Sequence, residues 1–219
     1  MTDVHVAMRR ALRARLQTAV RLTVGPLSNI TVGTGGTLTR SSGSWLTDGF
    51  LPGEVLTASG FAQAANNGTA TIKAVTASVL TLAKTTVAEA AGASVDLFVG
   101  LPAVAWEGRA YSPVVGTPFL REQLNPLPTY IVGFGAGGLE RHPALYLLDL
   151  LYPFGFGPSA AEAMAGTLRQ LFPPGLVLTA DGQQVRVAQA SRSALRPEAD
   201  WMLLPLTIRV EADAPAAAA

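Results

Sequence analysis

The segment from Leu22 to Gly100 differs sharply in composition from the sequence on either side of it. It holds twenty of the chain's 31 serines and threonines, both of its lysines and one of its fourteen arginines. Turn signals such as Gly35-Gly36 and Asn66-Asn67-Gly68 separate short runs of alternating apolar and polar residues. Strands that are short and regularly spaced predict a small all-β sandwich or barrel. The runs are Ile30–Val32, Thr37–Thr39, Val55–Thr57, Thr69–Ile72, Val79–Leu82 and Val95–Phe98.

The residues before this segment predict an amphipathic helix from Thr2 to Val20. Thr2 is the expected N-cap, and Asp3 suits the positive end of the helix dipole. Four arginines lie largely off the apolar stripe, namely Arg9, Arg10, Arg13 and Arg15. Apolar side chains recur every four residues, at Val4, Met8, Leu12, Leu16 and Val20.

Beyond Gly100 the sequence is again rich in arginine and proline. A second helix is predicted over Ser159–Phe172, because Pro158 suits a first helical turn and Pro173-Pro174-Gly175 ends the pattern. Five strands are predicted, at Val104–Glu107, Pro118–Leu124, Ala144–Tyr152, Gln184–Ala190 and Met202–Val210.

This order of elements indicates one domain inserted into another. A helix, an all-β block and then strands with one more helix fit poorly into one continuous fold, but they fit a host domain that the β block interrupts. We therefore predict an α+β host over residues 1–21 and 101–212, with a mixed or antiparallel sheet and two packed helices. Residues 22–100 form the inserted all-β domain, and residues 213–219 a disordered tail.

The composition limits the classes of function. Hydrophobic residues make up 49% of the chain and charged residues 14%, against about 25% charged in an average soluble protein. Neighbouring subunits that cover the surface would explain so few charges, and dilution by alanine and glycine is the alternative. A net charge of +1 gives no global basic field for nucleic acid, and the absence of cysteine excludes disulfides and thiolate sites. We expect a soluble, cytosol-made protein without a membrane span or signal peptide.

No catalytic constellation emerges from the sequence, so we expect no enzyme, no cofactor and no metal. Gly133–Gly138 matches the dinucleotide fingerprint G-x-G-x-x-G, but Pro143 blocks the helix that must follow it, and a hairpin tip is the preferred interpretation. The two histidines, His5 and His142, have no ligand cluster at zinc spacing. No G-x-S-x-G turn presents a serine nucleophile. The carboxylates Glu122, Glu140, Asp149 and Asp200 are interpreted as paired on solvated faces.

Two segments are candidate interaction surfaces. In the first helix, Arg9, Arg13 and Arg10 could contact phosphates, because residues four apart lie on one face, but a solvated helix face is the preferred interpretation. Arg9 and Arg13 are also candidates for a subunit or tube interface, and Arg10 is the candidate for DNA contact. In the Gly-rich loop Ile131–His142, exposed apolar residues would cost solubility unless they dock on a partner. The candidates in that loop are Phe134, Leu139 and Arg141. An ordinary hairpin that folds back on its own domain is the alternative.

Read without the insert, the host segments resemble the phage tail terminators, minor tail proteins of the lambda type. The cues are the helix segment Ala11–Leu16, the segments Leu101–Glu107 and Gly116–Arg121, and the Gly-rich stretch that leads into Arg141-His142. The strand Tyr146–Tyr152, the helix ending at Pro173 and a final strand Leu204–Val210 complete the order. The β block departs from the family's short connection, and resembles a β-rich domain that recurs in phage structural proteins.

The resemblance implies a structural virion protein at the head–tail junction, of a phage or a gene transfer agent. It implies a homo-oligomeric ring, a hexamer, that caps the finished tail tube and joins it to the head–tail connector or stopper protein. DNA would pass through the ring without being read, and no membrane is involved. Another neck or tube component is one alternative. A surface- or carbohydrate-binding module carried by the β block is another, which exposed Trp45 or Phe61 would support.

Overall fold

The computed structural model describes residues 3–133 and 138–215, and it is mostly β. Strands account for 49% and helices for 16% of it, in two large sheets, so the expected α+β class is wrong. The physical reason lies in the length of the strands. β11 (Leu139–Pro153) and β15 (Trp201–Pro215) each run for 15 residues, whereas the two main helices have 13 each.

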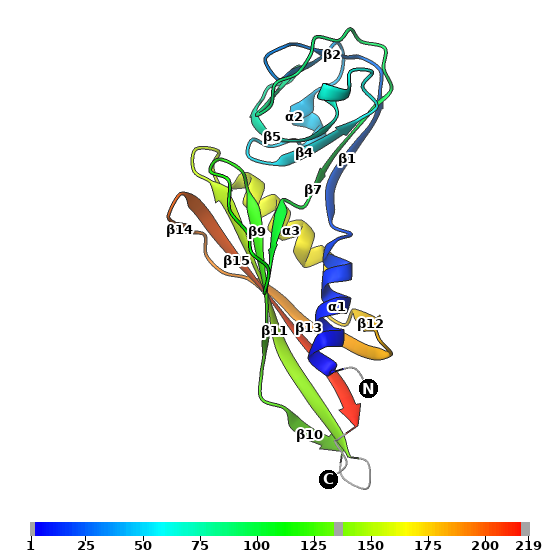
Figure 1. Cartoon of the computed structure of the whole chain (residues 1–219), viewed down its shortest axis with the longest axis vertical. Helices are drawn as coiled ribbons and strands as arrows, with labels where there is room; N and C mark the ends of the chain where they lie inside the picture. The colour runs from blue at the N-terminus through cyan, green and yellow to red at the C-terminus, as the bar shows by residue number, and fades with distance from the viewer. Residues whose placement is uncertain (1–2, 134–137, 216–219) are drawn as a thin grey trace.

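The first sheet contains seven strands and lies at one end of the elongated molecule (Figure 1). Its order is β1-β7-β4-β5-β6-β3-β2, and every neighbouring pair is antiparallel. Every run predicted in this segment is part of a strand. The strands are β1 (Val20–Leu27), β2 (Ile30–Val32), β3 (Thr37–Arg40), β4 (Val55–Ser59), β5 (Gly68–Val75), β6 (Val79–Leu82) and β7 (Val95–Gly100).

The strands and short helices of the first sheet enclose a hydrophobic core that is separate from that of the second sheet. Trp45, in the short helix α2 (Trp45–Asp48), is fully buried and meets Phe50 edge to face, with ring centroids 5.5 Å apart. The guanidinium of Arg40 lies over the Trp45 ring, 4.5 Å from its centre. The short 3-10 helix η1 (Ala64–Asn66) is held by Glu89, whose carboxylate accepts from the backbone N–H groups of Ala62 and Gln63.

The second sheet contains eight strands, with the order β12-β13-β15-β11-β9-β8; β10 pairs with β11, and β14 with β15. Among the described strand pairs of this sheet, only β8–β9 is parallel. Alternate residues of β11 and β15 face a core that the helices cover, including Tyr146, Leu148, Leu206 and Ile208. The remaining strands are β8 (Ala103–Trp106), β9 (Phe119–Pro126), β10 (Tyr130–Gly133), β12 (Val177–Ala180), β13 (Gln183–Arg192) and β14 (Arg196–Glu198).

Helices α1 (Val4–Leu16) and α3 (Ser159–Leu171) contribute the apolar faces that cover this core. The N-cap of α1 is Asp3, whose carboxylate accepts from the backbone N–H groups of His5 and Val6 at 2.9 and 3.2 Å; Thr2, the expected N-cap, lies outside the described residues. The helix ends at Leu16, four residues before the predicted end. Thr18 turns its hydroxyl back to the Arg15 carbonyl, and Val20 already belongs to β1.

The two sheets meet where β1 leaves α1 and β7 leads into β8 (Figure 1). Leu51 packs against the core of the second sheet, and Arg21 pairs with the buried Glu54 near this junction. Burial raises the pKa of Glu54, and the positive charge of Arg21 partly offsets that rise. Independent folding of residues 22–100 stays a prediction. Asp213–Pro215, expected in a disordered tail, are instead the last residues of β15.

Candidate functional site

The arginines of α1 fasten the helix to the rest of the molecule. Arg9 pairs with Glu107 at 2.9 Å, and Arg10 pairs with Asp181 at 2.8 Å. Arg15 donates to the Leu171 carbonyl at the end of α3. Arg10 remains the most accessible of the paired arginines, with 63% of its side chain exposed, so it is the one best placed to meet a further partner.

Arg13 joins α1 to β9 through a buried carboxylate. Its Nε and Nη2 donate to the two oxygens of Glu122 at 3.1 and 2.7 Å, and its guanidinium lies 5.0 Å from the ring centre of Trp106. The hydrogen bond to Glu122 raises the pKa of Arg13. The interpretation of Glu122 as a solvated carboxylate is wrong, since its side chain is completely buried. Burial, and then the charge of Glu122, raises the pKa of the neighbouring Tyr146 hydroxyl.

The two histidines lie against each other although they are far apart in sequence. The rings of His5 and His142 meet edge to face, with centroids 5.7 Å apart. His142 also contacts the Thr129 hydroxyl at 3.2 Å and lies 3.8 Å from the Glu140 carboxylate. The contact between His5 and His142 joins α1 to the base of the β10–β11 hairpin. Within residues 3–133 and 138–215, no group of three or more His, Asp or Glu could hold a metal ion.

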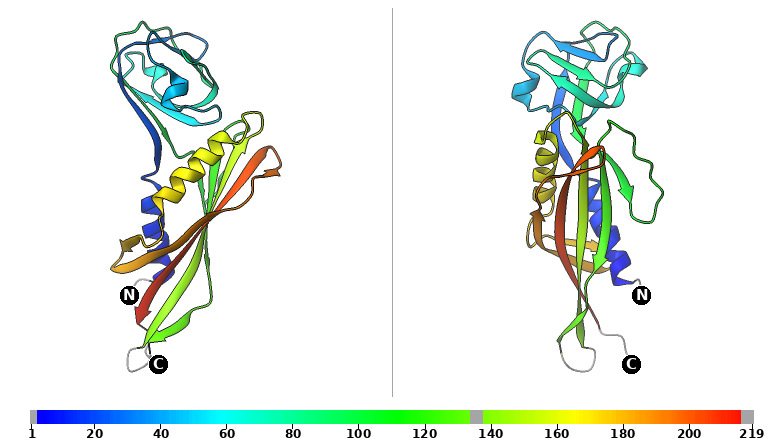
Figure 2. Two further views of the ribbon diagram at one scale, coloured as in Figure 1. Left: turned by 180° about the vertical axis from the view of Figure 1, so that it is seen from behind. Right: turned by 90° about the vertical axis from the view of Figure 1, so that its left-hand side faces the viewer.

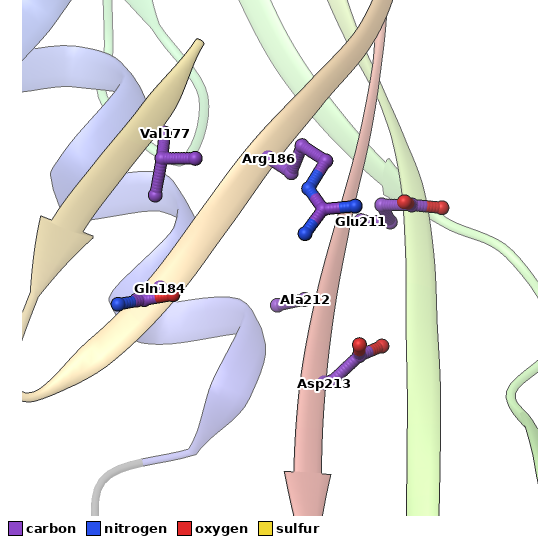
Figure 3. Close-up of a pocket in the computed structure, with 6 residues that line it drawn as sticks. All are labelled: Val177, Gln184, Arg186, Glu211, Ala212 and Asp213. Carbon is purple, nitrogen blue, oxygen red and sulfur yellow. The ribbon is translucent and has the colours of Figure 1, made fainter. Parts of the chain in front are cut away.

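A row of charged residues crosses β13, β15 and β11 near the hairpin. Arg141 donates to both carboxylate oxygens of Asp213, at 2.7 and 2.8 Å, and lies 3.7 Å from Glu211. These bonds hold the pKa of Asp213 below its usual value. Figure 3 shows Arg186 reaching from β13 toward Glu211, its partner in register on β15. The row is therefore largely neutralised within the chain.

The β10–β11 hairpin exposes an apolar surface, which we call the hairpin end. It forms the tip of the molecule opposite the first sheet (Figure 1). Phe134 lies outside the described residues, while Leu139 opens β11 and pairs with Gly133. Since Leu139 begins a strand, no helix N-terminus follows the glycine motif. The hairpin end consists of Tyr130, Ile131, Val132 and Leu139, which are 47%, 56%, 39% and 38% exposed.

A second accessible surface lies at the β8 edge of the sheet. The segment between β8 and β9 stands away from the sheet in the side view (Figure 2) and leaves a hollow of about 400 Å³ beneath it. We call this the β8 hollow. Its apolar lining includes Trp106, Tyr111, Pro113 and Phe119, and Arg109 also lines it. The same segment carries Val114 and Val115, the two most exposed large apolar residues of the described chain.

The sequence indicated the loop Ile131–His142 with Leu139 as a candidate surface, which stays a prediction, and it did not indicate the β8 hollow. Val114-Val115 beside Ser112-Pro113 and Gly116 was a visible signal, an apolar pair inside a turn-rich segment. The hollow had no such signal, because its walls come from β8, β9 and the segment between them. In the first sheet, Trp45 and Phe61 are 0% and 5% exposed, which removes the observation that would have supported a carbohydrate-binding module.

None of the helices in the described ranges has the length and apolar character that a membrane span requires.

A model of the family described as phage tail terminator protein matches residues 73–209, a range that also includes part of the first sheet. A solved structure is 26% identical, over 52% of this chain and 79% of that one, with a TM-score of 0.44. No curated protein matches the chain. Because the family model covers more than half of the sequence, this chain belongs to the phage tail terminator family, a family of the virion tail.

Proposed function

We propose that this protein is the ring-forming terminator that caps the finished tail tube and joins it to the head–tail connector. The observation that carries the proposal is the family match over residues 73–209, which includes β9, β11, α3 and most of β15. The low share of charged residues and the exposed apolar hairpin end support a surface that other subunits cover.

The mechanism would be templated association. Tube subunits stop adding once a ring covers their growing face, and the opposite face of that ring then docks the connector or stopper. A homohexamer is the proposed assembly, since the resemblance to tail terminators implies six copies. A heterologous contact between copies closes into such a ring when its rotation divides a full turn. The protein acts in this scheme by assembly and not by catalysis, and needs no cofactor.

DNA would pass through the ring without sequence recognition. A net charge of +1 and arginines that are largely neutralised inside the chain favour passage over tight binding. Arg10 is the proposed lumen contact, since most of its side chain is exposed beside its partner Asp181.

The residues proposed to contact neighbouring subunits or the tube differ in whether they already have a partner within the chain. Leu139 is exposed and can dock directly. Arg9, Arg13 and Arg141 already have partners in the chain, so their substitution would act first on the fold. The first sheet, at the end opposite the hairpin, is proposed as a brace or decoration that is not required for capping (Figure 1).

The experiment is a tube-length assay in particles made with and without this protein. A terminator predicts tubes of irregular or excessive length when the protein is absent, and a restored length when purified protein is supplied during assembly. Tubes of normal length that merely fail to join heads would identify a different neck component instead. Particles with no tube at all would identify a tube subunit.

A further inference from the structure

The hairpin end and the β8 hollow lie on different parts of the same molecule. Among residues 3–133 and 138–215, β10 pairs with β11 alone, so one edge of this four-residue strand has no described partner, and three of its residues expose apolar side chains. An apolar open edge in water favours association with another chain. The hollow offers the opposite shape, a recess walled by Trp106, Tyr111 and Phe119.

We propose that the hairpin end of one copy seats in the β8 hollow of the neighbouring copy. This inference rests on the proposed ring and identifies the two surfaces that build it. A knob and a recess at different sites make a heterologous contact, which repeats from copy to copy until the ring closes. Ile131 lies opposite Glu140 in register and so shares its face of the hairpin, and it supplies the apolar side chain that enters the aromatic recess.

Charge complementarity favours a second copy as the occupant. Glu140 pairs in register with Ile131, and its only ionic contact in the described chain is His142 at 3.8 Å. Arg109 forms no ion pair with any residue of the ranges 3–133 and 138–215. The Glu140 carboxylate on the hairpin and the Arg109 guanidinium at the hollow can therefore form an ion pair between two copies.

The other charges at the hollow are already satisfied. Arg121 is shared between Asp149 at 2.8 Å and Glu198 at 3.1 Å, and Glu107 is held by Arg9. Arg109 is thus the cation that remains available to a docked hairpin, and a pair between Glu140 and Arg109 would fix the register of the contact.

Charge reversal tests the pair directly in the full-length protein. Glu140→Arg and Arg109→Glu should each weaken self-association at least about tenfold in sedimentation velocity, and the double reversal should recover most of the loss. Glu162→Arg is the matched control: Glu162 lies on α3 and pairs with Arg192 at the end of β13, so its reversal should leave association unchanged. Single reversals without effect, or a double variant no better than either single one, would overturn the pairing.

Disulfide trapping provides a readout that does not depend on the charges, because the chain contains no cysteine. Ile131→Cys protein is mixed with Pro113→Cys protein, so that a disulfide between the two different variants can form only between copies. Under oxidation this mixture should form the mixed dimer much faster than Ile131→Cys mixed with Thr179→Cys on β12. Equal rates would contradict the seating of the hairpin in the hollow. A protein that stays monomeric in every experiment would contradict the proposed ring. A protein that forms a ring without these crosslinks would contradict only the proposed contact between the hairpin end and the β8 hollow.

Discussion

Arg13 on α1 and Glu122 on β9, 109 positions apart, form a two-point ion pair in which the carboxylate is completely buried. The pair fixes the position of the first helix on the second sheet. It also provides partners for both oxygens of a carboxylate that has no access to water, because Glu122 accepts from Arg13 and from the backbone N–H of Glu107.

We expect Arg13→Met to lower the free energy of unfolding by about 3–5 kcal/mol, because it leaves the Glu122 charge buried without its partner. Urea unfolding followed by circular dichroism measures the change. The double variant Arg13→Met with Glu122→Leu should regain much of the loss, since it removes both charges together. Arg192→Ala is the control, an exposed pair that should cost less than about 1 kcal/mol. A single variant as stable as the control would refute the structural role of the pair.

The Arg141–Asp213 pair predicts a specific pH dependence of stability. The lowered pKa of Asp213 means that its contribution to folding is present above the unfolded pKa of about 3.9 and is lost as the pH falls through the folded value. Asp213→Asn should therefore cost about 1 kcal/mol near pH 7 and progressively less below about pH 4. Unfolding free energies between about pH 2 and pH 7 measure this. The exposed Asp200→Asn serves as comparison, and a constant offset for Asp213→Asn at every pH would contradict the assignment.

The first sheet should be dispensable for folding of the second. Val20 and Gly100 are neighbours in register, so residues 23–99 can be replaced by a short Gly-Ser linker without moving the ends apart. We expect cooperative unfolding, with a loss of about 1–3 kcal/mol because Leu51 no longer covers part of the second core. Calorimetry measures the transition. A remainder that does not fold would show that residues 22–100 are not an inserted domain.

Exposed apolar residues of the hairpin should matter for assembly and little for stability. Ile131→Ser changes a side chain that is already 56% exposed, so the free energy of unfolding should move by less than about 0.5–1 kcal/mol. Tube capping and self-association should fall strongly in the same variant. Phe154→Ser, at a 50% exposed position away from the hairpin, is the control. Equal effects of the two variants on capping would argue against a special role of the hairpin.

The sequence predicted the local features of the fold well where one pattern dominated. The runs Ile30–Val32 and Val79–Leu82 coincide with β2 and β6, and α3 begins at the predicted Ser159. β1 was missed because Gly25-Pro26 interrupts its alternation. β11 and β15 were predicted too short, because both extend into charged residues such as Arg141 and Asp213, which neutralise each other across the strands.

Contacts between distant segments could not be read from the sequence. Nothing near Glu122 marks it as buried, because its partner Arg13 lies in another element far away in the chain. The contact between His5 and His142 and the walls of the β8 hollow have the same origin in the tertiary fold. The α+β class was wrong because the short apolar runs gave no measure of how far the central strands continue.

The mass of the purified full-length protein in solution tests the central proposal most directly. Light scattering at concentrations up to about 100 μM, supported by negative-stain images, should give six times the 22.7 kDa of one chain and a closed ring. A protein that stays monomeric over that range, and that still does not assemble when tail tubes are added, would contradict the account.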